Sequence, residues 1–221
     1  MPVTIARVGR VLAALSVPIA LQGVGAQTVS PIDHAVNTYA TMRTSRMIFT
    51  QTITNPLTGV TSTSRGEMQQ QVPGKIAVRF TEPPGDRIVS DGQYLWIYLP
   101  SSAPGQVIRS PAATNSAGVP DVTAQFLESP KKRYLITDRG PAEIRGRDTH
   151  AVELVPKDRS APFVKATIWV DDEDGIVRQF EVTDGNGLVR QVTFLNVFLN
   201  VSVAPATFVF KAPSDAKIIE Q

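Results

Sequence analysis

Apolar residues recur along this chain with two different periods. Over residues 31–43 they are spaced three or four positions apart, which is typical of a helix that buries one face. Ser30, Pro31 and Asp33 are favourable residues for the N-cap, the first helical position and the first turn. From residue 47 onward the alternation has a period of two, as in β-strands. The apolar stripe of the predicted helix consists of Ile32, Val36, Tyr39 and Met42.

The alternating region, residues 47–210, predicts about ten or eleven strands joined by short turns. Helices do not alternate with these strands, so the pattern indicates an antiparallel sheet. A sheet of this size tends to curl. The expected fold is therefore mainly β with some α: an unclosed antiparallel β-barrel with a helical lid over its concave side. Residues 110–129 lack a strand pattern, and Asp121 is suited to cap a short helix that carries Val122, Phe126 and Leu127.

One predicted strand, residues 94–99, is apolar on both faces. Its aromatic side consists of Tyr94, Trp96 and Tyr98, and leucine and isoleucine occupy the other side. An antiparallel sheet usually needs only one apolar face. The same excess occurs at residues 194–199. Two interpretations remain open: a core in two layers, or a cavity for an apolar ligand, because alternation does not distinguish a filled barrel from a hollow one.

The N-terminus has the pattern of a cleaved secretory signal. Arg7 and Arg10 precede an apolar stretch at residues 11–21 that is short for a membrane span. Small residues at 24–26 predict cleavage after Ala26, so that residues 1–26 are a signal peptide and residues 27–221 one domain. The alternative is a membrane anchor, which Pro18 and the small residues disfavour. We therefore expect an exported protein.

Composition narrows the possible functions. Without the signal, 20 basic residues face 20 acidic ones, which disfavours a nucleic-acid partner. The chain has no cysteine, so disulfides, thiol chemistry and a lipid-anchored N-terminus are not expected. Two histidines and no nucleophile motif predict neither an enzyme nor a metal site or cofactor. The acidic run at residues 171–175 is interpreted as a solvated hairpin tip, and the protein as a monomer.

The order of several motifs resembles a known family. Phe49-Thr50-Gln51 is followed by G-E-M, V-P-G-K-I-A-V-R-F and T-E-P-P, and later by V-E-L-V-P and a closing F-x-F-x-x-P that begins at Phe208. The most specific piece is V-S-D-G-x-x-L-W-x-Y at residues 89–98. Together these resemble the periplasmic outer-membrane lipoprotein carrier family, LolA, over nearly all of the chain after the signal.

The resemblance implies an unclosed β-barrel with a lid, and a carrier that shields lipoprotein acyl chains in an apolar cavity. It implies two protein partners: a lipoprotein-releasing ABC transporter of the inner membrane, and an acceptor lipoprotein of the outer membrane. We expect the cavity to be lined by Ile76, Val78, Tyr94, Trp96, Tyr98 and Phe194. We expect the lid to consist of Ile32, Val36, Tyr39, Met42, Phe126 and Leu127.

One position departs from the family pattern. Well-studied members of the family have an arginine before the proline of the V-P-G segment, and that arginine holds the empty lid closed. This chain has Val72 there, so Arg65 or Arg79 is expected to substitute, or the lid closes by apolar contact alone. A second function also remains open: a periplasmic sensor or scaffold of the same fold that binds lipid or lipoprotein without transporting it.

Overall fold

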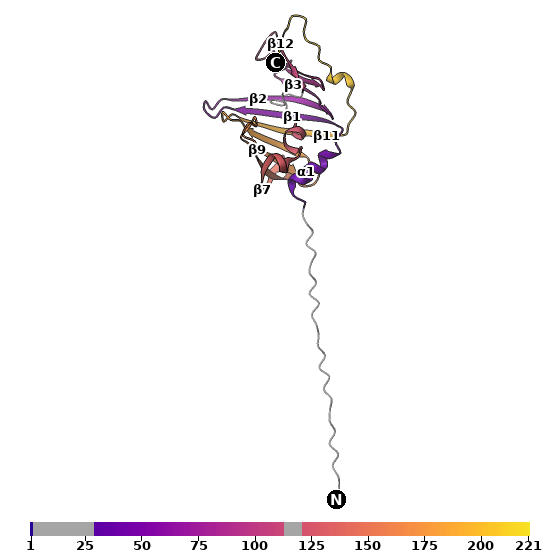
Figure 1. Cartoon of the computed structure of the whole chain (residues 1–221), viewed down its shortest axis with the longest axis vertical. Coiled ribbons are helices and arrows are strands. Elements are labelled where there is room, and N and C mark those ends of the chain that lie inside the picture. Colours follow the sequence, from indigo (N-terminus) through magenta and orange to yellow (C-terminus); the bar gives the residue numbers. More distant parts are fainter. Residues whose placement is uncertain (2–28, 113–120) are drawn as a thin grey trace.

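Twelve strands form one curved sheet in the computed structural model, which describes residue 1, residues 29–112 and residues 121–221 (Figure 1). The signal predicted at residues 1–26 lies almost wholly outside the described residues, as does part of the segment at 110–129. The strands are β1 Thr44–Thr54, β2 Thr61–Gln71, β3 Lys75–Glu82, β4 Arg87–Asp91, β5 Tyr94–Tyr98, β6 Gln106–Pro111, β7 Tyr134–Ile144, β8 Arg147–Pro156, β9 Lys165–Asp171, β10 Val177–Thr183, β11 Val189–Leu199 and β12 Lys217–Glu220. The helical elements are α1 Pro31–Ala40, the π-helix η2 Thr123–Leu127, α2 Pro130–Arg133 and the 3-10 helix η3 Pro205–Phe208.

The strand order is β12-β6-β5-β4-β3-β2-β1-β11-β10-β9-β8-β7. Every pair is antiparallel except β12 with β6, which is parallel. Strands β7 and β12 lie at opposite ends of this order, so the barrel is not closed. The expected fold is confirmed, although the strand count was slightly low. β12 was missed because a four-residue segment shows little alternation. Residues 208–210, predicted as a strand, belong instead to the end of η3 and the chain that follows it.

Strand register decides which side chains share a face of the sheet. Met47, Met68, Val78, Ile88 and Ile97 are directly paired in turn across β1 to β5, and all contribute to the hydrophobic core. Cross-strand partners point to the same side of a sheet. This row therefore marks the concave face, and the residues that alternate with it mark the convex face.

Helix α1 packs on the concave face near β8 and β9. It begins where sequence signals predict: the Ser30 hydroxyl accepts a hydrogen bond from the Asp33 amide, and Pro31 occupies the first turn. Its buried side chains are Ile32, Ala35 and Tyr39. Among the described residues, no helix has the length and apolar character needed to cross a membrane.

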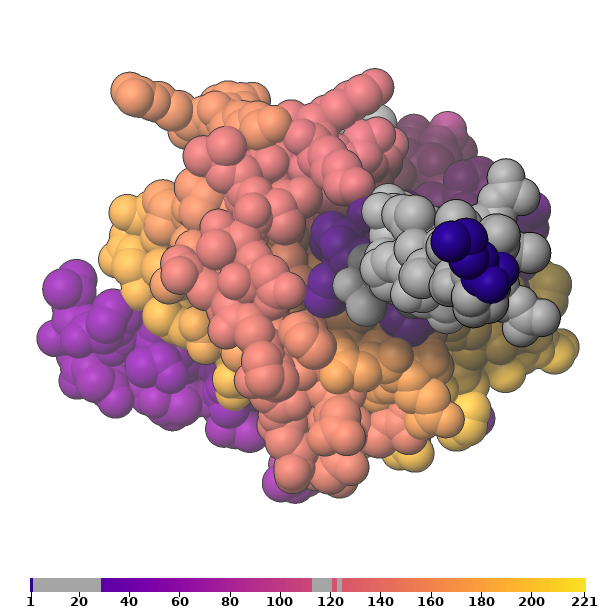
Figure 2. All heavy atoms as spheres, turned by 90° about the horizontal axis from the view of Figure 1, so that it is seen from below, coloured from indigo at the N-terminus to yellow at the C-terminus, as the bar shows by residue number. Residues whose placement is uncertain are grey.

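The β1–β2 hairpin projects beyond the neighbouring strands (Figures 1 and 2). Its turn, residues 55–60, leaves Leu57 and Val60 largely exposed. The hairpin tip takes no part in the core, which lies between the concave face and the helical elements.

Candidate functional site

The helical elements cover the concave face with apolar side chains. Ile32, Tyr39 and Met42 from α1 and its C-terminal end are buried in the same core as Phe126 and Leu127 of η2. Val36 packs against this core and is partly buried. All six side chains expected to form a lid are therefore in contact with the core on the concave side.

An aromatic cluster joins η2 to the sheet. The Phe126 ring lies 5.3 Å from that of Phe180 on β10 and 6.1 Å from that of Phe163. Phe180 is in turn 6.0 Å from Phe194 on β11. Both Phe126 and Phe180 are almost completely buried. Without the Phe126 side chain, the concave face would have an apolar hollow at this place.

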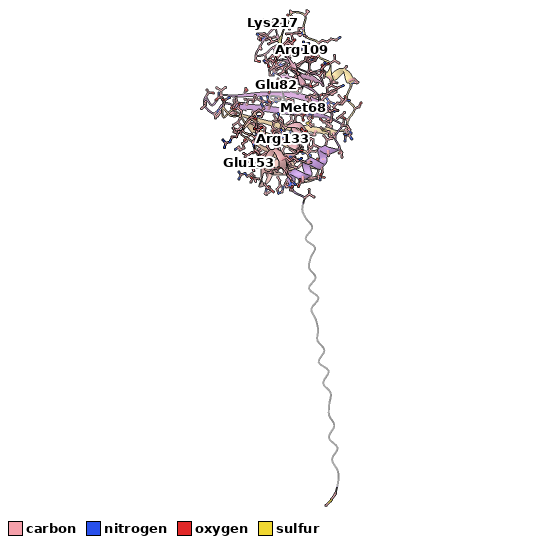
Figure 3. The ribbon with its side chains drawn as sticks, in the orientation of Figure 1. Met68, Glu82, Arg109, Arg133, Glu153 and Lys217 are labelled. Carbon is pink, nitrogen blue, oxygen red and sulfur yellow. The ribbon has the colours of Figure 1, made fainter. Side chains whose placement is uncertain are left out.

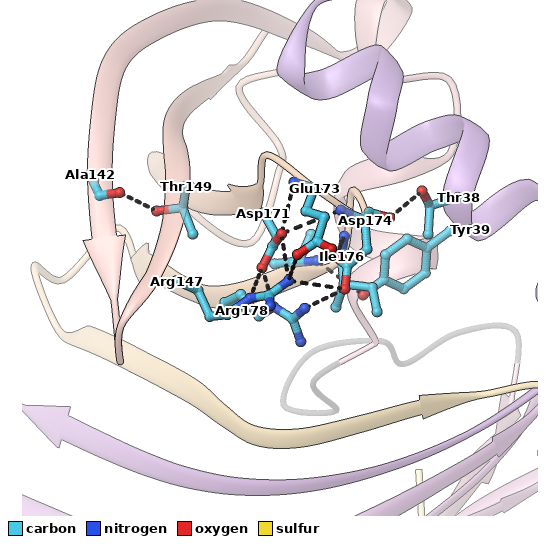
Figure 4. Close-up of polar contacts among 11 residues, drawn as sticks. Thr38, Tyr39, Ala142, Arg147, Thr149, Asp171, Glu173, Asp174, Ile176 and Arg178 are labelled. Atoms are coloured by element: carbon cyan, nitrogen blue, oxygen red, sulfur yellow. Dashed lines mark hydrogen bonds and ion pairs between the residues drawn. The ribbon is translucent and has the colours of Figure 1, made fainter.

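Two polar contacts fasten the C-terminal half of α1 to the β9–β10 hairpin (Figure 4). The Thr38 hydroxyl donates to the Asp174 carbonyl at 2.8 Å, and the Tyr39 hydroxyl accepts from the Val177 amide at 3.3 Å. Burial of the phenol raises the pKa of Tyr39 well above its usual value. Gly175 lies against the helix, since a Cβ built there would be 2.5 Å from the Thr38 hydroxyl.

Asp171 is the centre of the charged network beneath this contact (Figure 4). Its buried carboxylate accepts from Arg147 Nε at 2.7 Å, from Arg178 Nε at 2.8 Å and from the Glu173 amide at 2.9 Å. Although burial opposes ionisation, the two guanidinium groups hold the pKa of Asp171 far below its usual value. Arg178 also pairs with Asp174, whose carbonyl receives Thr38. The interpretation of residues 171–175 as a solvated hairpin tip holds for Asp172 and Glu173, which are exposed, but it was wrong for Asp171, which is buried. The network around Asp171 shapes the surface on which α1 rests.

The expected cavity residues separate onto two faces. Ile76, Val78 and Phe194 are buried in the concave core. Tyr94, Trp96 and Tyr98 point to the opposite side, because the residues of β5 that alternate with them, Leu95 and Ile97, contribute to the concave core. Their assignment to the cavity was wrong.

The aromatic side of β5 is covered by the chain after η3. Phe210 lies 5.6 Å from the Trp96 ring and 6.1 Å from the Tyr98 ring, and the Arg109 guanidinium stacks 4.8 Å from the centre of the Tyr94 ring. The apolar surface on both faces of β5 is thus explained by a second, smaller layer on the convex side. A core in two layers was one of the two interpretations that the sequence left open.

Comparisons with known proteins agree with this architecture. The family of the outer membrane lipoprotein carrier protein LolA matches residues 40–211. The chain belongs to the LolA family. An outer-membrane lipoprotein carrier protein from Nitrosospira multiformis is 28% identical over 179 residues, which cover 81% of this chain and 83% of the relative. One from Methylobacillus flagellatus is 22% identical over 212 residues, which cover 96% and 97%. An uncharacterized conserved protein from Thermus thermophilus has a similar fold, with a TM-score of 0.55 and 11% identity over 86% of this chain and 97% of that one.

The lid of this LolA-family protein is not fastened by either expected arginine. Arg65 pairs with Glu82 at 3.0 Å, and both side chains are largely exposed on the convex face. Arg79 lies directly opposite Arg87 on that same face. Val72 is largely exposed. Since α1 and η2 cover the concave side, Arg65 and Arg79 point away from the lid, and their expected role as a latch was wrong.

The sequence did not predict the charged network that supports the hairpin under α1. Arg147 begins β8, and Arg178 lies seven residues after Asp171 on the returning strand of a hairpin. Arginines that flank an acidic turn were the available signal, but only strand pairing brings Arg147 to the same carboxylate.

Charged groups elsewhere do not form a metal centre among the described residues. His150 Nδ1 lies 2.7 Å from the carboxylate of Asp172, and both side chains are partly exposed. Figure 3 shows Lys217 and Arg109 at the top of the molecule, whereas Arg133 and Glu153 both lie lower down. Lys131 of α2 pairs with Asp33 of α1 at 2.7 Å, which links the two helices that flank the concave opening.

Proposed function

We propose that this protein is a periplasmic carrier whose concave face shields the acyl chains of lipoproteins. The observation that supports this most directly is the apolar cover: α1 and η2 contribute wholly buried side chains to the concave core, including Tyr39 and Phe126. Membership of the LolA family supports the carrier role.

Elementary energetics explain why a carrier is needed. Exposing one acyl chain of about 16 carbons to water costs about 12 kcal/mol, at about 0.8 kcal/mol per methylene. A triacylated protein therefore does not cross an aqueous compartment unaided. A carrier must also release its cargo, so the protein surface that shields the chains has to be replaceable.

The closed arrangement meets that requirement. Acyl chains that enter the concave face exchange one set of apolar contacts for another when they displace Phe126 and Tyr39. Two hydrogen bonds connect α1 to the β9–β10 hairpin. Few polar contacts therefore have to break when α1 leaves the sheet. A ligand shifts such an equilibrium only by its preference for the open form.

The proposed route begins at the lipoprotein-releasing ABC transporter of the inner membrane and ends at the acceptor lipoprotein of the outer membrane. We propose that the signal at residues 1–26 exports the chain and is removed after Ala26. The protein without its signal then acts as a monomer, with no cofactor.

The test is a release assay. Protein lacking residues 1–26 is added to spheroplasts, and lipoproteins in the supernatant are measured by immunoblot; binding of a fluorescent fatty-acyl probe is measured in parallel. We expect release and saturable probe binding. A protein that binds the probe but releases no lipoprotein would be a sensor or scaffold, and one that does neither would contradict the proposal altogether.

A matched pair of variants locates the activity. Tyr39→Asp places a charge on the buried face of α1, whereas Asn37→Asp places the same charge on the exposed face. We expect Tyr39→Asp to lose release and Asn37→Asp to retain it, with circular dichroism confirming that the sheet remains folded in both. Full release by Tyr39→Asp would show that α1 is not part of the cover.

A further inference from the structure

A hollow lies on the convex face, on the opposite side of the sheet from the concave core. It has a volume of about 720 Å³ and lies between strands β2 to β4 and the C-terminal segment at residues 206–211. Its floor includes Ala77 and Val89, and Val209 and Phe210 form an apolar wall. We call this hollow the convex groove. Its volume is within the range of small-molecule sites.

Three cations line the convex groove. They are Arg79 on β3, Arg87 on β4 and Lys211 on the segment that crosses the sheet. Among the described residues, the side chains of these three make no hydrogen bond or ion pair, and all three are exposed. Arg79 is close enough to Glu67 to lower the pKa of that carboxyl electrostatically. Glu67 also lines the groove, but its carboxylate is bound by Arg46 at 2.7 Å and by Gln69 at 2.6 Å. The groove therefore carries an excess of unpaired positive charge.

Two of these cations repel each other when no ligand is bound. Arg79 and Arg87 are direct cross-strand partners. Like charges directly opposite each other destabilise a sheet, and guanidinium pairs of this kind match the oxygens of a phosphate. Glu67, across from Arg79 on the other side, attracts Arg79 but is also paired with Arg46, so its single negative charge offsets only part of this repulsion.

We propose that the convex groove binds the phosphate headgroup of an anionic lipid. Arg79, Arg87 and Lys211 surround the phosphate, and the exposed side chain of Val209 with Phe210 contacts the apolar part next to it. A peptide is a weaker fit, because β2, β3 and β4 each have two paired neighbours and offer no free edge to an added strand. The groove is thus a second lipid contact, on the opposite side of the sheet from the concave core.

The test uses short-chain, monomeric dihexanoylphosphatidylglycerol and isothermal titration calorimetry on the protein lacking residues 1–26. We expect saturable binding that persists when the concave face is occupied by a fatty-acyl probe. Arg79→Gln with Arg87→Gln should weaken it about tenfold or more, since two charge-assisted contacts are lost. Arg139→Gln, which removes a charge from β7 at the far end of the sheet, should leave it unchanged.

The double variant also provides a check on folding. Because it relieves the repulsion between directly opposed arginines, its melting temperature should equal or exceed that of the wild type. Four results would overturn the proposal: no binding of dihexanoylphosphatidylglycerol, equal binding by the double variant, inorganic phosphate binding as tightly as the lipid, or a glutamate-rich peptide binding in its place. A fifth result would also overturn it: loss of dihexanoylphosphatidylglycerol binding when the fatty-acyl probe is added. The two ligands would then compete for the concave face.

Discussion

The hydroxyl of Tyr39 accepts a hydrogen bond from the backbone amide of Val177, at 3.3 Å, and so joins the end of helix α1 to the start of strand β10. The two residues are 138 positions apart in the chain. Both are buried, so the amide loses its partner whenever α1 leaves the sheet. This contact is a direct structural link between the cover and the hairpin that supports it.

Tyr39→Phe should loosen that link without emptying the core. Leaving one buried amide without a partner lowers the free energy of unfolding by about 1–3 kcal/mol. We expect faster uptake of a fluorescent acyl probe in stopped-flow measurements. Tyr98→Phe removes a hydroxyl from the convex face and should leave the uptake rate unchanged. Uptake by Tyr39→Phe at the wild-type rate would mean that this hydrogen bond does not restrain the cover.

Gly175→Ala should disturb the seat of α1. A Cβ at Gly175 would lie 2.5 Å from the Thr38 hydroxyl and 2.8 Å from His34 Cδ2. The residue also has φ +70°, a value that favours glycine. We expect lower thermal stability and greater hydrogen exchange in residues 31–40. Gly146→Ala is the control, because it has φ +77° and open space around the position. Equal exchange in both variants would show that backbone strain alone is responsible.

Phe126→Ala and Phe208→Ala should separate the cover from the rest of the molecule. Both side chains are buried, but only Phe126 belongs to the concave core. Each substitution should lower the free energy of unfolding by about 3–5 kcal/mol, measured in urea. Phe126→Ala should nevertheless retain or increase affinity for an acyl probe, because it removes a side chain that competes with the ligand. The same gain in Phe208→Ala would contradict this account.

Brominated acyl chains that bind in the concave face should not quench the native tryptophan fluorescence. Both tryptophans, Trp96 and Trp169, lie on the convex side of their strands, since Leu95 and Ile168 next to them enter the core. In a protein that carries Trp96→Phe and Trp169→Phe, the further change Phe180→Trp should produce quenching, because Phe180 belongs to the concave core. Strong quenching of the native tryptophans would place the ligand on the convex face instead.

Acid should weaken the network around Asp171. Its pKa is lower in the folded protein than the ordinary 3.8, so ionised Asp171 stabilises the fold above about pH 4, and this contribution is lost as the pH falls further. We expect Asp171→Asn to lower the free energy of unfolding at pH 7 by about 3–5 kcal/mol, because two arginines lose their shared partner. The difference from the wild type should shrink as the pH is lowered below 4. Asp215→Asn, at an exposed loop position, should follow the wild-type curve.

Local patterns accounted for much of the fold. The stripe at Ile32, Tyr39 and Met42 is buried as predicted, because the spacing of apolar residues on a helix depends only on neighbours in the chain. The short helical segment with Phe126 was identified for the same reason. Alternation likewise located most strands and indicated an antiparallel, unclosed sheet.

The choice between faces could not be made in this way. Tyr94, Trp96 and Tyr98 alternate with Leu95 and Ile97, and both sets are apolar. Which set is inside depends on register with β4 and on Phe210, more than a hundred residues later. The burial of Asp171 likewise depends on Arg147, which strand pairing supplies from β8.

By itself, the sequence determined the periods of its elements, the absence of cysteine and the motifs of the LolA family, since each is a property of adjacent residues. Only the tertiary structure decided which apolar face the helices cover, which charges hold α1, and where unpaired arginines meet across β3 and β4. Those features arise from contacts between distant segments, whose free energy depends on register and packing that no local pattern encodes.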